Sequence, residues 1–518
     1  MKQKFLGFAV LLQCMFISLF AQQVNYVADS TFSSNGQLTF NFYNNIDRAF
    51  GSALQPDNKL VVVGLSKNAQ SGFFELCFVR LNDDGSNDML FGTNGVQKVS
   101  LGNQGSIGGM TPVVRIANDG KIVACNSGRS AAGTSQDMMV CRLDTNGVLD
   151  NTFGNNGVAF IDVMGTGSQP DLASDFIIDP TNNIYIVGAC RTGFSPLDND
   201  IAMAKLNSNG QLDVSFNSTG TKLFNPTGMA EFARAVRLRN DGKIAVGAAA
   251  GNNMMVMVMD TTGTLDNSFG TAGVFSVSFA SGFPSFYTMQ LYSDNRLLIG
   301  GNVSAANEDM ALARILPNGT LDPTFGVGGK QTYNLKNTDE ALTTIIIGSD
   351  EKIWLGGSVQ NTTTNFDFMA ARLDSTGTLD TDFNATGYVS YNAAISNAPD
   401  LCNSLILMPD SKLFFVGIIE ISAAVNEDIG MVRLKPEAPV TSAIAENQNI
   451  MFPYPNPCQQ ILMIKSNVTD VVQIINAQGN VCRNVPLAKG VNTINTHTLP
   501  DGLYFVNGPK TKLTFIKN

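Results

Sequence analysis

The residue types that most often carry out catalysis are scarce in this chain. Its 518 residues include one histidine, His497, and eight cysteines without Cys-x-x-Cys spacing. A single imidazole close to the C-terminus cannot supply a catalytic triad or a His-rich zinc site to the rest of the chain. The scattered cysteines indicate neither a metal knuckle nor a disulfide framework, although Cys458 and Cys482 could form one bridge. The sequence therefore predicts no catalytic residue, no cofactor and no metal site of these kinds.

Carboxylates are the remaining candidates, because a pair of Asp or Glu side chains can hydrolyse a glycoside. Six acids lie five residues before a basic residue: Glu75 and Arg80, Asp137 and Arg142, Asp200 and Lys205, Asp309 and Arg314, Asp367 and Arg372, Asp428 and Arg433. A catalytic residue should be singular, so this recurrence favours a structural role. Five strand residues span about 16 Å, so the two side chains of one strand cannot touch. Either the acid pairs with a basic residue of a neighbouring repeat, or it caps the turn that begins its strand.

Turns such as DTNGVLD, from Asp144, faintly resemble calcium-binding loops. A calcium loop needs several oxygen ligands and usually a bidentate acid at its end, whereas here the spacing is short and Gly comes early. A turn stabilised by Asp or Asn, with Gly at positive φ, explains the same residues. We therefore expect no metal ion in these turns.

The N-terminal 21 residues have the pattern of a secretory signal peptide. Lys2 and Lys4 precede an apolar stretch from Phe5 to Phe20, and the small residue Ala21 follows. This stretch is too short for a stable membrane anchor, and no later segment has about 18 consecutive apolar residues. We expect the mature protein to be secreted or to lie at the outer cell surface, with no transmembrane segment.

The charge balance argues against one class of partner. Residues 22–437 contain 25 Lys or Arg against 40 Asp or Glu, a net charge of −15. Nucleic-acid binding needs a basic surface that neutralises phosphates, so no nucleic-acid partner is expected.

Two motifs interleave along residues 22–437, each in seven copies. One is a polar turn followed by a run that is apolar at nearly every position, such as NKLVVVG from Asn58, which is typical of a strand covered on both faces. Each repeat has room for about four strands, so the sequence predicts an all-β fold, a seven-bladed β-propeller, with an open solenoid as the alternative. The other motif is Asp-x-x-Phe with Gly four residues after the Phe, beginning at Asp29, Asp88, Asp150, Asp213, Asp266, Asp322 and Asp380.

The phase of these repeats favours a closed ring. The chain enters through the motif at Asp29 and leaves the repeats after Arg433-Leu434, where that motif would come next. The first segment is therefore expected to dock on the last repeat.

The repeats resemble a known family. The stretches LDTNGVLDNTFGNNG from Leu143 and LDSTGTLDTDFNATG from Leu373 are similar to the bacterial delta-60 repeat. The resemblance covers residues 24 to about 437 and implies an extracellular β-propeller, an architecture more than an activity. The fourth copy departs from the pattern, because Asn253 and Val258 replace the acid and the basic residue.

A separate module follows a linker at residues 438–450. Residues 451–518 contain short strand-like runs between Gly or Asn turns, which predicts a small β-sandwich. The module resembles the type A C-terminal sorting domain of the type IX secretion system of Bacteroidetes. The resemblance implies that the secretion machinery and a sortase are its partners. The residues that match the family motifs are Tyr454, Pro455, Asn456, Pro457, Gly479, Gly502, Tyr504 and Lys517.

Two classes of function remain open for the repeats. The first is a non-enzymatic scaffold that binds an extracellular protein or glycan, and the second is a secreted hydrolase, such as a glycosidase, with singular carboxylates at the mouth of the ring. The loops after the apolar strands vary most in length, and loops on a rigid scaffold often carry recognition. They place Arg129, Arg191 and Phe194 as candidate contacts with a ligand. The single tryptophan, Trp354, lies in an apolar run and is expected to pack between blades rather than to bind a sugar.

Overall fold

The computed structural model describes residues 23–33, 35–43, 46–104, 111–130, 135–165, 169–193, 199–279, 282–304, 306–362, 365–393, 399–422, 426–437, 453–454, 458–466, 469–508 and 512–518. The expected signal peptide and linker lie outside these residues. Every regular element of the described residues is a β-strand, which confirms the all-β class. The chain divides into two compact units, residues 1–437 and 438–518.

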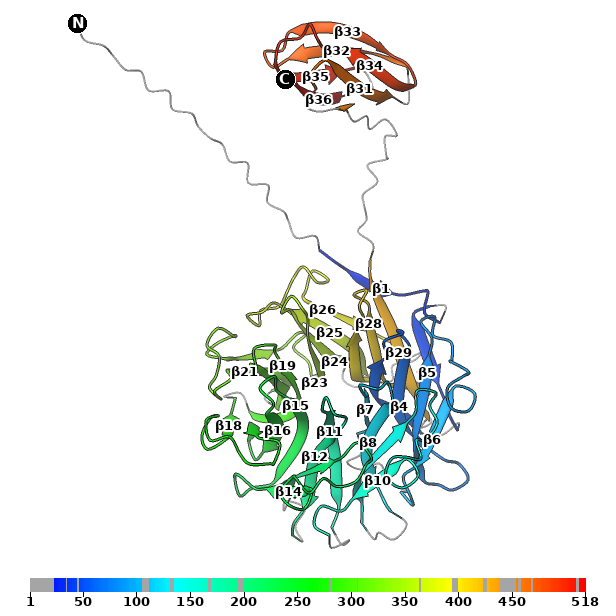
Figure 1. The fold of residues 1–518 in the computed structure, drawn as a ribbon, viewed down its shortest axis with the longest axis vertical. Helices are drawn as coiled ribbons and strands as arrows, with labels where there is room; N and C mark the ends of the chain where they lie inside the picture. Colours follow the sequence, from blue (N-terminus) through cyan, green and yellow to red (C-terminus); the bar gives the residue numbers. More distant parts are fainter. Residues whose placement is uncertain are drawn as a thin grey trace, which may run out of the picture. The chain divides into compact units, whose positions relative to one another are not determined.

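The described part of the first unit forms seven antiparallel sheets (Figure 1). Six of them have four strands each and follow one another in sequence: β3 (Asp47–Leu54), β4 (Leu60–Lys67), β5 (Phe74–Leu81), β6 (Val96–Ser100); β7 (Val113–Ile116), β8 (Ile122–Gly128), β9 (Asp137–Leu143), β10 (Val158–Ile161); β11 (Asp171–Ile178), β12 (Ile184–Arg191), β13 (Asn199–Leu206), β14 (Thr221–Phe224); β15 (Glu231–Leu238), β16 (Ile244–Ala250), β17 (Asn253–Met259), β18 (Val274–Val277); β19 (Phe283–Leu291), β20 (Leu297–Ser304), β21 (Glu308–Ile315), β22 (Lys330–Tyr333); β23 (Glu340–Ile347), β24 (Ile353–Thr362), β25 (Asn365–Leu373), β26 (Tyr388–Tyr391).

The last sheet joins the two ends of the repeat region. It contains β27 (Asp400–Leu407), β28 (Leu413–Ser422) and β29 (Asn426–Pro436), and β29 also pairs with β1 (Tyr26–Ala28) and β2 (Gln37–Phe40). The Asp29 carboxylate accepts a bond of 2.9 Å from the Arg433 guanidinium. This pairing confirms that the first segment docks on the last repeat.

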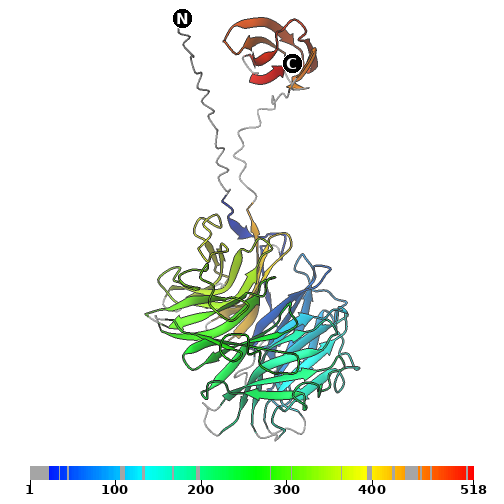
Figure 2. The same cartoon turned by 60° about the vertical axis from the view of Figure 1, so that its left-hand side comes forward.

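The sheets follow one another around a closed circle. The first strand of each sheet contacts the previous sheet, through the pairs β3–β7, β8–β11, β11–β15, β15–β19, β19–β23 and β23–β27, and β3 contacts β27 of the last sheet to complete the circle. Figure 2 shows the same sheets from a second side. The closed circle differs from the open solenoid that was the alternative architecture.

Each polar turn connects the first and second strands of a sheet with one residue at positive φ. That residue is the first of the turn motif in all seven copies: Asn58, Gly120, Asn182, Gly242, Asn295, Glu351 and Ser411. Asn and Gly suit this left-handed conformation because they tolerate it better than other residues. The turn therefore fixes where each buried second strand begins.

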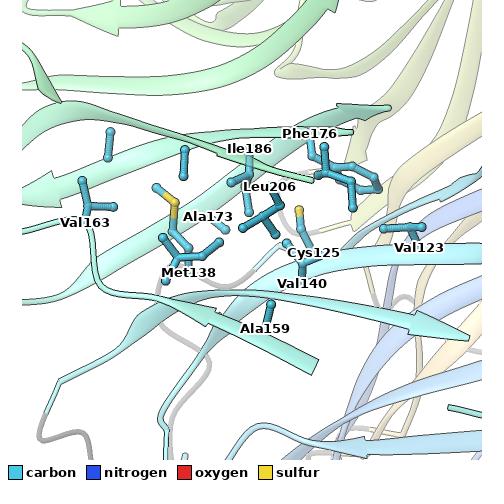
Figure 3. Close-up of a cluster of buried hydrophobic side chains, with 14 of the residues drawn as sticks. Val123, Cys125, Met138, Val140, Ala159, Val163, Ala173, Phe176, Ile186 and Leu206 are labelled. Carbon is cyan, nitrogen blue, oxygen red and sulfur yellow. The ribbon is translucent and has the colours of Figure 1, made fainter. Parts of the chain in front are cut away.

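The hydrophobic core lies between neighbouring sheets. In one such cluster, Val123 and Cys125 of β8 and Met138 of β9 meet Phe176 of β11 and Ile186 of β12 (Figure 3). A strand packed by a sheet on each side must be apolar at successive positions, which explains the continuous apolar runs. Trp354 fits the same scheme, because it is 5% exposed and packs in a cluster of buried side chains. The described cysteines of these repeats are buried and unpaired core residues, as expected from the sequence.

The second unit has two sheets around its own core. One contains β30 (Pro453–Tyr454), β31 (Ile461–Ser466) and β34 (Gly490–Asn495), and the other contains β33 (Val481–Leu487), β32 (Asp470–Asn476), β35 (Gly502–Asn507) and β36 (Lys512–Lys517). Side chains of both sheets share one hydrophobic cluster. Cys458 is buried and Cys482 exposed, and both are free, so the suggested bridge between them is wrong.

Candidate functional site

The basic residue that ends each third strand pairs with the Asp of the Asp-x-x-Phe motif. The six carboxylate-to-nitrogen distances are 2.7–2.9 Å, in the pairs Arg80–Asp88, Arg142–Asp150, Lys205–Asp213, Arg314–Asp322, Arg372–Asp380 and Arg433–Asp29. The suggested pairing of these basic residues with the acid of a neighbouring repeat is therefore wrong. The basic residue lies near the end of its strand, about 16 Å from the acid that begins the strand. At that end it lies next to the Asp of the Asp-x-x-Phe motif.

The arginine also reaches the neighbouring sheet. The Arg80 guanidinium donates 2.6 Å to the carbonyl oxygen of Thr145, which lies in the turn after β9, and its carbon lies 4.8 Å from the centre of the Phe91 ring. Arg80 is 6% exposed, and Phe91 is fully buried. Arg142, Arg314 and Arg433 make the same bond to a carbonyl oxygen of the neighbouring sheet, so these clusters fasten one sheet to the next, at what we call the motif end of the sheets.

The fourth repeat lacks the arginine but places Arg239 near the same motif. Val258 cannot pair, so Asp266 keeps the Lys243 ammonium, at 2.6 Å, a bond that the turn lysines Lys59, Lys121 and Lys352 also make to the motif Asp of their repeats. The Arg239 guanidinium lies 5.9 Å from the Phe269 ring centre and donates to the carbonyl oxygen of Pro317 in the next repeat. The departure in the sequence is therefore compensated in space.

The acids that begin the third strands lie at the opposite end of the sheets, which we call the loop end. There they come close to a second acid, which lies at the start of the first strand of the next sheet: Asp428 with Asp47, Asp137 with Asp171, Asp200 with Glu231 and Asp309 with Glu340. Glu340 is fully buried, and its Oε2 atom has no hydrogen-bond partner. Burial, aided by the charges of Asp309 and Asp339, raises the pKa of Glu340 to about 7. Asp171 and Glu340, which burial affects most, therefore hold a proton more readily than an exposed carboxyl group does.

A cavity of about 460 Å³ lies at the centre of the ring, which we call the central cavity. The first strands of all seven sheets contribute to its wall. Six of these strands contain a β-bulge, and bulges commonly aim a side chain at a functional site. The extra residue of every bulge lines the cavity: Phe50, Ser174, Arg234, Tyr287, Thr343 and Asn403.

These bulge residues do not repeat. The six positions carry six different side chains, whereas the turns and the motif clusters recur around the ring. Each bulge residue lies eight positions before the first residue of its polar turn, as Ser174 does before Asn182 and Arg234 before Gly242. Aligning the repeats on this turn shows a column that varies in chemistry, which the recurring motifs alone do not reveal.

A cluster of three charges forms part of the cavity wall. Asp175 of β11 accepts 2.6 Å from Arg115 of β7 and 2.8 Å from Arg237 of β15, so it joins three successive sheets. The backbone N–H groups of Phe176 and Val236 also donate to this carboxylate. Burial would raise the pKa of Asp175, but the two guanidinium groups outweigh burial and hold the pKa below its ordinary value. Asp175 is therefore a charged, fully bonded group.

Other polar groups complete the wall. The hydroxyls of Ser52 and Ser404 are 2.8 Å apart, and the Asn403 amide donates 2.7 Å to the Ala49 carbonyl oxygen. Arg234 forms no ion pair or hydrogen bond with the described residues, and Tyr287 is 42% exposed. The cavity can thus offer a free cation, hydroxyls and an aromatic ring to a ligand.

The candidate contacts on the variable loops lie elsewhere. Arg129 follows β8 and Arg191 ends β12, the second strands of neighbouring sheets. Both arginines are half-buried and do not line the central cavity. Phe194 lies outside the described residues. Their role in binding stays a prediction.

In the second unit, several of the matching residues come together beside the last strand. Gly502 pairs with Lys517, and Tyr504 pairs with Phe515, in the β35–β36 ladder. The Tyr504 hydroxyl donates 2.7 Å to the Pro500 carbonyl oxygen, and the Lys517 ammonium bonds to Asp501 at 3.0 Å. Gly479 lies in the turn after β32, whose Asn476 pairs with Tyr504. Of the first motif, the backbone of Tyr454 pairs in β30, and residues 455–457 lie outside the described residues. The single histidine, His497, is exposed in a turn of this unit.

Known families identify this unit. Residues 453–517 match the family model described as a secretion system C-terminal sorting domain. The unit is a type IX secretion sorting domain. A sorting domain of this kind implies interaction with the secretion machinery and export to the medium or outer surface. In the first unit, residues 55–91, 117–153, 198–216 and 293–325 match a β-propeller domain of unknown function, DUF5122, so the sorting domain exports a β-propeller.

Solved structures with a similar arrangement are distant in sequence. A PL25 ulvan lyase is 12% identical, with 76% of this chain and 95% of that chain covered and a TM-score of 0.47. A virginiamycin B lyase from Staphylococcus aureus is 12% identical, with 77% and 98% covered and a TM-score of 0.45. The β-propeller domain of the Trilobed protease from Pyrococcus furiosus is 10% identical, with 78% and 99% covered and a TM-score of 0.39. No curated protein matches the sequence.

Two further observations concern the described residues. They contain no helix long and apolar enough to cross a membrane. Within the same residues, no three His, Cys, Asp or Glu side chains are grouped so that they could hold a metal ion.

Proposed function

We propose that residues 22–437 form a seven-bladed β-propeller that binds an extracellular glycan or protein in its central cavity without catalysing a reaction. The observation that carries this proposal is the set of six bulge residues, which differ from one another inside a ring that otherwise repeats. Because the fold does not require the same side chain at these six positions, each can carry the side chain that a ligand requires. One fold can serve many functions through such variable positions.

The rest of the chain supplies the route to the cell surface. In this proposal residues 1–21 are a cleaved signal peptide, 438–450 are a linker, and 451–518 are a β-sandwich that the secretion machinery and a sortase read. The delta-60 resemblance of the repeats and the Bacteroidetes resemblance of the tail support the same route.

The alternative is a secreted hydrolase that uses two carboxylates, such as a glycosidase. Glycosidases of this kind hold their two carboxyl groups about 5–10 Å apart. Among the described residues that line the central cavity, Asp175 is the one carboxylate, and two arginines bind it. This arrangement favours binding over hydrolysis.

A blocking substitution tests the proposal. The full-length protein would be screened on glycan and protein arrays, and Ser174→Tyr, which fills the cavity from a bulge, should abolish the signal of any ligand found. Val214→Tyr is the matched control, because Val214 is 66% exposed and does not line the cavity. Retained binding by Ser174→Tyr would place the site elsewhere, and release of reducing ends from a bound glycan would favour the hydrolase.

A further inference from the structure

We propose that the central cavity binds an acidic sugar residue of a glycan, with the Arg234 guanidinium as the contact for its carboxylate or sulfate group. This inference rests on the proposed function, since it names the chemistry of the ligand for the same cavity.

The charge of the cavity is opposite to that of the unit around it. Its described wall contains three arginines, Arg115, Arg234 and Arg237, and one aspartate, Asp175, which leaves a net charge of +2. The sequence of residues 22–437 has a net charge of −15. Positive charge that survives in the centre of an acidic unit attracts an anion, and walls of low dielectric constant strengthen the attraction.

The three arginines are not equivalent. Asp175 neutralises part of the charge of Arg115 and Arg237, and the guanidinium groups of both also donate to backbone carbonyl oxygens, of Phe176 and Val236. Arg234 has no counter-charge among the described residues. Burial lowers the pKa of Arg234, which means that its charge is poorly solvated, and the partly exposed Tyr287 opposes this effect. An oxyanion beside Arg234 would satisfy a group that the protein leaves unsatisfied.

The other wall residues indicate a sugar rather than a protein side chain. The volume of about 460 Å³ lies in the range of small-molecule sites, so one or two sugar rings can enter where a folded protein surface cannot. Thr343 and Asn403 line the cavity at neighbouring bulges. The Thr343 hydroxyl donates to the Gly356 carbonyl oxygen and the Asn403 amide donates to the Ala49 carbonyl oxygen, so each side-chain oxygen is left to accept a bond from a sugar hydroxyl. Tyr287 adds a partly exposed aromatic ring. Hydroxyl-rich, ring-shaped ligands use this combination.

Calorimetric titration of the full-length protein tests the inference. The probes are a galacturonic acid tetramer, a sulfated galactose tetramer, a neutral galactose tetramer and a tetraglutamate peptide. We expect the two acidic sugars to bind, the neutral sugar to bind at least tenfold more weakly, and the peptide to bind more weakly than either acidic sugar. The relative affinity of the two acidic sugars tells a carboxylate ligand from a sulfate ligand.

Substitutions at Arg234 give the decisive comparison. Arg234→Gln should weaken binding of the acidic sugars at least tenfold with no change in the neutral sugar, and Arg234→Lys should bind more tightly than Arg234→Gln. Arg48→Gln is the matched control, because Arg48 is also on a first strand, pairs with Glu427 and does not line the cavity. The thermal midpoint of each variant confirms that it is folded.

The outcomes separate the two proposals. Equal affinity for neutral and acidic sugars, or unchanged binding by Arg234→Gln, overturns this inference and leaves a binding cavity. Tighter binding of the tetraglutamate peptide overturns it in favour of an acidic protein segment. If no probe binds and the arrays also find no ligand that Ser174→Tyr blocks, both proposals fail.

Discussion

The motif clusters and the Asp175 cluster use the same chemistry in two regions of the ring. Around Arg80 and Arg142, a buried arginine bonds to a carboxylate of its own sheet and to a carbonyl oxygen of the next sheet, and the arrangement recurs at successive interfaces. Around Asp175, one carboxylate bonds to arginines of two other sheets, and the arrangement occurs once in the cavity wall. A cluster that recurs at successive interfaces indicates a structural role in joining sheets, whereas a cluster that occurs once indicates a role specific to the cavity. Substitutions in the two kinds of cluster test this comparison.

The largest effect is expected from Arg433→Met in the cluster that closes the ring. Arg433 and Asp29 are each 1% exposed as side chains, so the substitution leaves a buried carboxylate without its main partner. Breaking a buried pair in this way costs about 3–5 kcal/mol of unfolding free energy. Urea unfolding would measure the loss, and Arg48→Met, which breaks a half-exposed pair with Glu427, should cost less than about 1 kcal/mol. Similar losses in both variants would contradict a special role for the closing cluster.

Asp175→Asn is expected to cost less stability but to change binding. Arg115 and Arg237 keep part of their exposure to the cavity, with side chains 33% and 18% exposed, so water can solvate them after the charge is removed. We expect a loss of about 2 kcal/mol, together with a higher affinity for anionic probes because two guanidinium groups are released. Unfolding and calorimetric titration measure the two effects. A stability loss as large as that of Arg433→Met, with no gain in anion affinity, would make the cavity cluster equivalent to the motif clusters.

Gly147→Ala tests how tightly a motif Phe is held by the next repeat. A methyl group at Gly147 would lie 2.4 Å from the Phe91 ring, and the residue has a φ of 81°. Gly242 has nearly the same φ, 80°, but no atom within 4 Å of such a methyl group. Gly242→Ala should therefore show the conformational strain alone, about 1 kcal/mol, and Gly147→Ala should lose about 1–2 kcal/mol more through the clash. Thermal unfolding compares the two, and equal losses would mean that the ring of Phe91 moves aside.

The last effect depends on pH and contrasts the two ends of the sheets. Burial opposes ionisation of Asp29 at the motif end, but the hydrogen bonds from Thr31 and the charge of Arg433 outweigh burial and lower the pKa of Asp29 to about 2. The ionised Asp29 therefore stabilises the fold above about pH 4, and this stabilisation is lost as the pH falls from about 4 to about 2. At the loop end, the pKa of Glu340 is raised to about 7, so the folded state binds a proton that the unfolded state releases, and stability falls as the pH rises from about 4.5 to 7. Glu340→Gln should therefore stabilise the protein by up to about 3 kcal/mol at pH 8 and leave it unchanged at pH 4.

Glu308→Gln is the control for this effect, because Glu308 lies on β21 beside Asp309 but is not fully buried. Unfolding of both variants at pH 4, 6 and 8 gives the profile. A gain from Glu340→Gln that is equal at pH 4 and pH 8 would show that Glu340 stays charged at both.

The sequence was informative where the structure repeats. The apolar runs and the docking of the first segment on the last repeat were predictable, because both follow from motifs that recur seven times in the chain. The partner of the basic residue was predicted wrongly, since spacing along one strand does not show which residues meet where the strand ends. The acids at the loop end were noticed, but their neighbours, such as Glu340 beside Asp309, come from the next repeat.

The central cavity was not predictable by the same reasoning. Arg115 and Arg237 occupy a position where other repeats carry Ile177 or Ile346. Because neither arginine belongs to a recurring motif, a search for recurring residues does not select them. A β-bulge leaves no mark in an apolar pattern, because the extra residue at Ser174 or Arg234 simply shifts the pairing by one. Alignment of the repeats against one another, followed by a search for the columns that differ, is the analysis that would find such a site.

The closing sheet also sets an order of events during folding. Six sheets use neighbouring strands and can form as soon as their own repeat is present, whereas Asp29 and Arg433 are 404 residues apart, so we expect them to meet last. A loop of that length slows the encounter, and until then β29 presents an unpaired edge that another chain could occupy. The segment around β2 must therefore remain unattached while the rest of the ring assembles, and a chain cut short before residue 426 would remain an open ring prone to exchanging strands with its neighbours.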